Sequence, residues 1–374
     1  MRKLFLMAAT VGVALTSCVN DKLDNLGGQV DSQQKITFTN PVVGGAQTKA
    51  VPGEINTTTK YPTAEKFRVF AQWDKTSYAE WGGSGSAVYM NDVEVSHRAT
   101  LGSNGAWYPA TDYFWPREGV LSFWAASPST ELSGKLAYDQ TNGIQIGEII
   151  IPANGFTKEQ ADAQADVAST QYDLMYAPIV KDQKKSTTTD DDTQYNGVDL
   201  AFKHALSLIK FDIKLKEEYT GTTIKLKRIS ISGINSKSAG FNENITGTPT
   251  WQTPSDTTSY EVANYPTGKQ LANTLAIDVY TDTDIKGKRL ILMPQEIANK
   301  ETTKIIIGYT IQSAGGAEIE QTIETKLYHS SLTKWEPGKA YFYHLILALD
   351  QIYFDPVASD WETDTNQEIE VPQA

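Results

Sequence analysis

The chain has 374 residues, of which 40% are hydrophobic, and its formal charge at pH 7 is −12. A surface this acidic repels nucleic acid and anionic lipid headgroups, so no nucleic-acid partner is expected. A single cysteine excludes an intramolecular disulfide, and core packing alone must hold the fold together. The length favours about two domains.

The N-terminus has the pattern of an export signal. Two positive charges precede an apolar run over residues 4–15, which is too short to span a bilayer comfortably. Residues 15–18, Leu-Thr-Ser-Cys, match a bacterial lipobox, in which the thiol of Cys18 takes the lipid. The alternative is an ordinary secretory signal with an incidental cysteine. We predict a lipoprotein signal peptide over residues 1–17 and a lipid on Cys18 as the only membrane attachment.

A polar tether follows, and then the first predicted strand. Residues 35–43 alternate, with Ile36 and Phe38 on one face. Residues 44–63 contain two prolines and three glycines without any hydrophobic period. Such a composition indicates an exposed loop that proteases reach easily.

Most of the remaining chain consists of short runs in which apolar and polar residues alternate, the pattern of β-strands. A short polar helix is expected only over residues 157–168, and the charged stretch 181–197 indicates a domain boundary or a long loop. The pattern predicts an all-β fold of two sandwich domains. The expected strands cover residues 66–73, 89–95, 120–126, 143–151, 198–214, 224–232, 275–280, 289–294, 304–312, 319–327 and 340–349.

The C-terminal stretch gives the longest strand signal. Apolar residues occupy every second position from Tyr341 to Leu349, and the polar end of the chain has Ile369 and Val371 again two residues apart. The last eight residues form either a further strand or a frayed tail.

Residues for catalysis or metal binding are scarce. The four histidines are scattered, which argues against a zinc site, and His204 is interpreted as a hydrogen-bonded histidine within a strand. The acidic runs 192–197 and 282–287 each depart from the calcium-loop pattern at two positions. We therefore expect no catalytic residue, no metal, no cofactor and no enzymatic activity, although a hydrolase using an unidentified pair of carboxylates stays open. Aromatic residues between positions 107 and 124 are interpreted as core rather than as a sugar-stacking surface.

Several stretches resemble, in the correct order, the fimbrillin-like proteins, the type V pilins of Gram-negative surface fimbriae. The resemblance covers nearly the whole chain after the signal. It is carried by the lipobox cysteine and by the segments ITF (36–38), TKA (48–50), KFRVFAQW (66–73), YFWPREGVLSFWAASP (113–128), DLMYAP (173–178), VDLAFKHALSLIKFDI (198–213), LILMPQ (290–295), WEPGKAYFYHL (335–345) and FDPVASDWE (354–362).

The resemblance implies two transthyretin-like β-sandwich domains in tandem, here residues 50–197 and 198–374. It also implies a lipoprotein precursor cut by a trypsin-like or arginine/lysine-specific protease. The cut would fall between Lys49 and Ala50 and remove residues 18–49, with Lys60 and Arg68 as alternative sites.

The resemblance further implies polymerisation by donor-strand exchange. Loss of Ile36 and Phe38 would open a groove, and Ile369 and Val371 of a neighbouring subunit would fill it. The partners would be other pilin subunits, with the outer membrane holding the lipidated precursor and the mature protein forming a surface fimbria that supports adhesion. A shaft role is expected first, with an anchor or tip subunit as alternatives. Another alternative is a non-polymerising surface lipoprotein that binds glycans through Trp81, Trp107 or Trp115.

Overall fold

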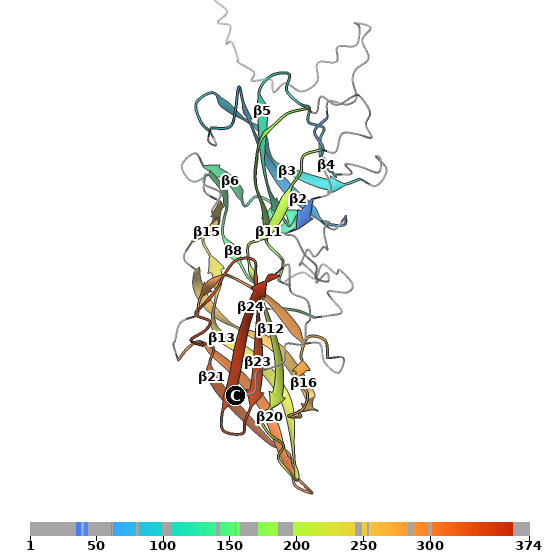
Figure 1. Ribbon diagram of the computed structural model, residues 1–374, viewed down its shortest axis with the longest axis vertical. Coiled ribbons are helices and arrows are strands. Elements are labelled where there is room, and N and C mark those ends of the chain that lie inside the picture. The colour runs from blue at the N-terminus through green and yellow to red at the C-terminus, as the bar shows by residue number, and fades with distance from the viewer. Residues whose placement is uncertain are drawn as a thin grey trace, which may run out of the picture.

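The all-β prediction is confirmed, in an elongated molecule (Figure 1). Among the described residues the helical segment is the single short α1 (Ser129–Leu132), and none of their helices is long and apolar enough to cross a membrane. The computed structural model describes residues 35–38, 41–43, 61, 63–79, 82–98, 107–139, 143–153, 155–157, 171–185, 197–243, 249–252, 254–282, 287–297 and 301–361.

The first sheet separates two hydrophobic cores. All eight residues of its central strand β5 are buried, because neighbouring residues face opposite cores: Phe123 packs in one and Trp124 in the other. We call the core that contains Phe123 the groove core and the larger one the main core. In spatial order the sheet consists of β1 (Val42–Val43), β11 (Ala201–His204), β10 (Met175–Gln183), β5 (Val120–Ser127), β2 (Lys66–Asp74), β3 (Ser86–His97) and β4 (Trp107–Pro109).

Two further sheets enclose most of the main core. One contains, in order, β24 (Ile352–Asp360), β23 (Lys339–Leu347), β12 (Ser207–Leu215), β18 (Lys288–Leu292) and β9 (Phe156–Thr157), with β17 (Ile277–Asp278) beside β12. The other contains β16 (Pro254–Gln270), β13 (Thr222–Ser238), β20 (Lys304–Ser313) and β21 (Ile319–Lys326), with β8 (Ile149–Ile150) beside β13. The remaining pairings join β15 (Pro249–Trp251), β14 (Phe241–Glu243), β7 (Gly143–Ile146) and β6 (Leu136–Asp139), and also β19 (Gln295–Glu296) with β22 (Lys334–Trp335).

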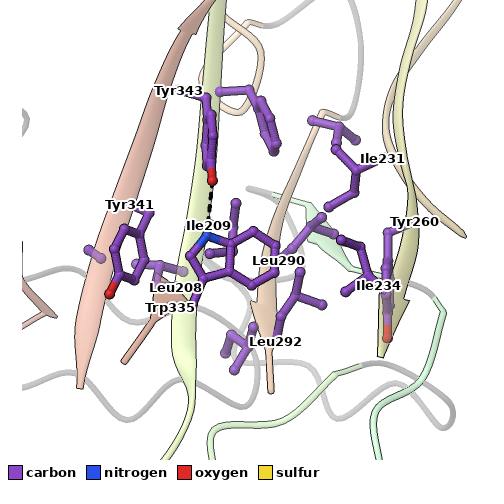
Figure 2. Close-up of a cluster of buried hydrophobic side chains, with 14 of the residues drawn as sticks. Leu208, Ile209, Ile231, Ile234, Tyr260, Leu290, Leu292, Trp335, Tyr341 and Tyr343 are labelled. Atoms are coloured by element: carbon purple, nitrogen blue, oxygen red, sulfur yellow. Dashed lines mark hydrogen bonds between the residues drawn. The ribbon is translucent and has the colours of Figure 1, made fainter. Parts of the chain in front are cut away.

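Side chains from both of these sheets meet in the main core, as Figure 2 shows. Ile209 of β12 and Leu290 of β18 lie on one side, and Ile231 of β13 lies on the other. The indole N–H of Trp335 donates a hydrogen bond of 3.0 Å to the hydroxyl of Tyr343, so two large amphipathic side chains are buried without losing their polar partners. This face-to-face packing of sheets is a β-sandwich.

The structure does not test the domain boundary predicted after residue 197, but it places the surrounding residues. Val198, Leu200 and Phe202 pack in the groove core together with Ile36 and Phe38. Strand β8 pairs with β13, and β9 pairs with β18, so short segments from the first half join sheets built from the second half. Two tandem transthyretin-like domains stay a prediction.

Several strand predictions need correction. The predicted strand 198–214 is two strands, β11 and β12, and only Ile277–Asp278 of the predicted strand 275–280 is extended and paired. Strand β16 was not predicted, because its sequence is mostly polar and contains Pro and Gly; its apolar stretch from Tyr260 to Tyr265 is short, and the rest of its length pairs along β13. The C-terminal strand signal is a hairpin of β23 and β24. Of the predicted helix 157–168, only Thr157 is described, and it belongs to β9.

Candidate strand-binding groove

The predicted first strand lies between two other segments of the chain and bonds to both. On one side the N–H groups of Ile36 and Phe38 donate to the carbonyl oxygens of Tyr113 (2.7 Å) and Trp107 (3.0 Å) in an antiparallel arrangement. On the other side the N–H of Val198 donates to the carbonyl of Thr37 at 2.9 Å. Residues 35–38 therefore close the gap between β4 and the chain leading into β11.

The same segment continues as β1, which pairs in parallel with β11. Val42 lies opposite Ala201 and Val43 opposite Phe202, and the N–H of Val42 donates to the carbonyl of Leu200 at 3.1 Å. Residues 35–38 have hydrogen-bonded neighbours on both sides, so their removal would leave two rows of unpaired backbone groups, whereas β1 pairs with β11 alone among the described residues.

The apolar side chains of this segment are buried as the alternation predicted. Ile36 is 1% exposed and Phe38 is fully buried. The ring of Phe38 meets those of Phe67 and Phe123 edge-on, with centroids 5.8 Å away in both cases. Edge-to-face contacts of this kind add to the burial of the rings. Phe38 is therefore the main apolar anchor of the segment.

Gly197 provides the closest approach to the segment. Its φ is +77°, and a Cβ atom built at this position would lie 2.8 Å from both the carbonyl oxygen of Thr37 and the carbonyl carbon of Phe38. Real Cβ atoms do not come this close to a backbone. Only glycine permits both the positive φ and the close contact with the segment.

Tyr61 covers the groove near residue 41. Its N–H donates to the carbonyl of Pro41 at 2.7 Å, and its hydroxyl donates to the carbonyl of Lys66 and lies 2.7 Å from Ser127 Oγ. Burial raises the pKa of this phenol well above its usual value, so Tyr61 stays protonated and can act as a donor. Its ring also packs on Phe202, with the centroids 5.1 Å apart.

The opposite end of the segment is open to solvent. The ammonium of Lys35 lies 2.6 Å from a carboxylate oxygen of Asp112, and both side chains are about 40% exposed. Exposed ion pairs contribute little stability. The groove therefore binds its strand through apolar contacts and backbone hydrogen bonds rather than through charge.

Near the C-terminus the described chain ends at a buried tryptophan. Among the described strands, β24 lies at the edge of its sheet and pairs with β23 alone. It is followed by Trp361, which is fully buried. The predicted donor residues Ile369 and Val371 lie outside the described residues. The same is true of Cys18, Lys49 and Ala50, so the predictions of lipidation and cleavage remain predictions.

The histidines and acidic residues considered as metal-binding candidates do not form such a site among the described residues. His204 Nδ1 lies 2.8 Å from a carboxylate oxygen of Asp173, and both side chains are buried, as expected for a strand histidine. In the part of the chain that the structure describes, no three His, Cys, Asp or Glu residues gather closely enough to hold a metal ion.

The core interpretation of the aromatic residues is confirmed for Trp107, Trp115, Phe123 and Trp124, whereas Phe114 is 40% exposed. Glycan binding through Trp107 or Trp115 is therefore contradicted, because neither ring has a face available to a sugar. Trp81 lies outside the described residues.

Sequence reasoning missed three features of the groove. It did not identify the role of Gly197, the covering position of Tyr61 or the parallel pairing of β1 with β11. A glycine after a polar run and an isolated tyrosine carry no periodic signal, and a parallel partner some 160 residues away leaves none either.

Comparisons with known proteins agree with this architecture. A family model described as fimbrillin-like matches residues 48–361. A fimbrial protein from Bacteroides vulgatus is similar in structure, with a TM-score of 0.57 and 16% sequence identity over 88% of this chain and 99% of that protein. A protein from Bacteroides uniformis, described as a candidate cell adhesion protein, has a TM-score of 0.46 and 17% identity over 89% of this chain and 100% of its own.

A comparison with curated protein sequences gave no match. At 16% identity the Bacteroides vulgatus structure establishes similarity of fold alone. The family model spans most of the sequence, from residue 48 to residue 361. The chain therefore belongs to the fimbrillin-like family.

Proposed function

We propose that this protein is a structural subunit, with shaft as the expected position, of a surface fimbria assembled by donor-strand exchange. Membership of the fimbrillin-like family supports a cell-surface, pilus-type subunit that interacts with other pilins. The observation that carries the finer proposal is the position of residues 35–43. Residues 35–38 lie between two hydrogen-bonded neighbours, and β1 adds a parallel pairing with β11.

The energetics favour replacement of this strand over an empty groove. Ile36, Phe38 and Val43 are each at most 3% exposed, and burying one such side chain stabilises by roughly 1.5–3 kcal/mol. Together they contribute roughly 5–9 kcal/mol, comparable with the whole stability of many domains. A groove without a strand would also expose unpaired backbone groups. A second strand of similar pattern relieves both costs by β-strand addition.

The donor would be the C-terminal tail of a neighbouring subunit. Ile369 and Val371 reproduce the two-residue spacing of Ile36 and Phe38. Addition of each tail to the groove of the next molecule is heterologous and does not close, so it generates a filament. The proposed cut after Lys49 would free the first strand without breaking any described strand.

The maturation steps complete the proposal. The precursor is exported, lipidated on Cys18 and held at the outer membrane, and a trypsin-like or arginine/lysine-specific protease then cuts between Lys49 and Ala50. The structure disfavours Arg68 as the cleaved residue, because this side chain lies in β2 and is hydrogen-bonded to Asp92. Lys60, in the same predicted loop as Lys49, stays an alternative.

The first experiment is to identify the N-terminal residue of the protein sheared from the cell surface, by intact mass and terminal sequencing. A chain that starts at Ala50 supports the proposal. A chain that starts at lipidated Cys18 contradicts it and favours an anchor subunit or a surface lipoprotein that does not polymerise.

Variants at the two ends test the exchange itself. Lys49→Ala should block maturation, with Lys60→Ala as the matched control that should not. Deletion of residues 367–374 should leave a folded, lipidated monomer that accepts a donor strand but cannot provide one. If both the Lys49→Ala variant and the deletion polymerise normally, the strand-exchange mechanism is wrong.

A further inference from the structure

The described chain ends on an unusual aromatic contact. The indole of Trp361 is fully buried and stacks face to face on the imidazole of His204, with ring centroids 4.1 Å apart and planes within 8° of parallel. Asp173 holds the imidazole at its edge, where its carboxylate accepts a hydrogen bond of 2.8 Å from His204 Nδ1. Both members of this pair are buried, so the imidazole cannot turn away without leaving a buried carboxylate poorly solvated.

The backbone of Trp361 is also fixed. Its N–H donates to the carbonyl of Gly338 at 3.0 Å, and the N–H of Gly338 donates to the carbonyl of Leu206 at 2.9 Å. Leu206 follows His204 by two residues, on the connection from β11 to β12. Ring and backbone of Trp361 are therefore both attached to the short stretch around His204. In Figure 1 the arrow of β24 points from its own sheet toward the seven-stranded sheet that contains β11.

The strand that carries His204 also forms one wall of the groove. Within β11 the exposure alternates, so Phe202 and His204 point to the same, buried side. Phe202 packs on Tyr61 and Phe67 in the groove core and lies opposite Val43 of β1. One side chain of the groove, Phe202, and the imidazole that stacks on Trp361 are thus two residues apart on the four-residue strand β11.

We propose that Trp361 is the positioning residue of the C-terminal tail, and that the strand bound in the groove sets its position through β11 and His204. A strand paired with β11 holds β11 in place and keeps the imidazole flat under the indole. When the groove is empty, β11 loses its partner on that side, the stack loosens and the tail leaves the fold in a less defined direction. Because such coupling is reciprocal, loss of Trp361 also weakens the hold of β11 on residues 42–43.

The inference rests on the proposed function only in treating residues 362–374 as the donor tail. The coupling itself is a property of one molecule. It predicts that a subunit with a filled groove presents its tail in a fixed direction, which favours growth of a filament from occupied subunits.

The test uses hydrogen–deuterium exchange of the uncut full-length chain at single-amide resolution. The amide of Val42, which donates to the carbonyl of Leu200, reports the pairing of β1 with β11. Trp361→Ala should increase its exchange rate by about 5- to 150-fold, the usual range of coupling between two sites. Trp335→Ala is the matched control, because Trp335 is similarly buried in the same main core but its ring neighbours are Tyr341 and Tyr343 rather than His204.

Two more variants separate positioning from general loss of stability. Trp361→Phe retains an aromatic face over His204 and should keep the slow exchange of the Val42 amide. Trp361→Leu retains apolar bulk without stacking and should accelerate that exchange. In the reverse direction, Phe38→Ala should accelerate exchange at the Trp361 amide. This reverse measurement does not require any Trp361 variant to fold.

The proposal is overturned if the amide of Val42 exchanges at the wild-type rate in Trp361→Ala, or if Trp335→Ala accelerates it equally. It is also overturned if Phe38→Ala leaves the Trp361 amide unchanged. None of these measurements needs a polymer. Filament formation without coupling would refute this inference alone, and coupling in a chain that never polymerises would refute the donor-strand proposal alone.

Discussion

Gly197 offers the most direct test of the first strand's position. Alanine at Gly197 would bring a Cβ atom to 2.8 Å from both the carbonyl oxygen of Thr37 and the carbonyl carbon of Phe38, and to 2.9 Å from the Cα of Phe38. All three contacts are with backbone, so no flexible side chain can move aside. Either the groove widens or residues 35–38 leave it.

The expected loss of unfolding free energy in Gly197→Ala has two parts. Alanine at a φ of +77° costs about 1–2 kcal/mol through backbone strain alone. The contact adds at least about 1 kcal/mol if the groove widens to accept the methyl group. It adds at most roughly 3–6 kcal/mol, the burial of Ile36 and Phe38, because complete expulsion of the segment relieves the clash.

Gly221 provides a matched control. Its φ is +75°, almost the same as that of Gly197, but a Cβ atom there would meet nothing within 4 Å. Strain and the effect of alanine on the unfolded chain are therefore shared by Gly197→Ala and Gly221→Ala. Only the contact with residues 37–38 differs between the two variants.

The assay is urea denaturation of the uncut chain, with limited proteolysis of the first strand as a second measurement. We expect Gly197→Ala to lose at least about 1 kcal/mol more than Gly221→Ala and to release residues 35–43 to protease. A difference in unfolding free energy below about 0.5 kcal/mol, the usual error of such comparisons, would refute the placement of the strand against Gly197.

Three further predictions concern packing and charge. Phe38→Ala should lower the unfolding free energy by about 3–5 kcal/mol in urea titrations, and a loss below about 1 kcal/mol would mean that its ring is not a core anchor. Trp335→Phe should lower the unfolding free energy by about 1–3 kcal/mol, because it leaves the buried hydroxyl of Tyr343 without its donor. Adding Tyr343→Phe should recover part of that loss, and no recovery would contradict the role of the hydrogen bond. The hydrogen bond from Lys66, and after it that from Ser129, lowers the pKa of Glu94. The contribution of ionised Glu94 to folding stability is therefore present above the usual carboxylate pKa and is lost as pH falls through the lowered value. Glu94→Gln should therefore be slightly less stable than wild type at pH 7 and equally stable near pH 2, and a constant difference across thermal melts at both pH values would contradict this.

Much of the local structure could be predicted from period and composition. The alternation of Ile36 with Phe38 predicted a strand with one apolar face, and both side chains are buried. The cluster that includes Trp107 and Trp124 was predicted to be core because aromatic residues at strand spacing pack inward. These predictions succeeded because burial of one face of a strand is encoded within a few residues.

Strand ends and hairpins were harder to predict. The alternation from Tyr341 to Leu349 predicts one strand, but the chain turns after Leu347 and returns as β24. The mostly polar strand β16 left only a short signal, from Tyr260 to Tyr265, because a ladder of backbone hydrogen bonds along β13 does not require apolar side chains over its whole length.

The sequence by itself determined that the chain is all-β, held by packing without disulfides, and patterned along nearly its whole length like the fimbrillin-like proteins. Only the tertiary structure decided that residues 35–38 lie between Trp107 and Val198, that Gly197 must be glycine for them to fit, and that Trp361 rests on His204. Each of these facts is a contact between residues far apart in the chain. Local period states which side of a strand is buried, but the choice of neighbour and register depends on how all the sheets pack at once.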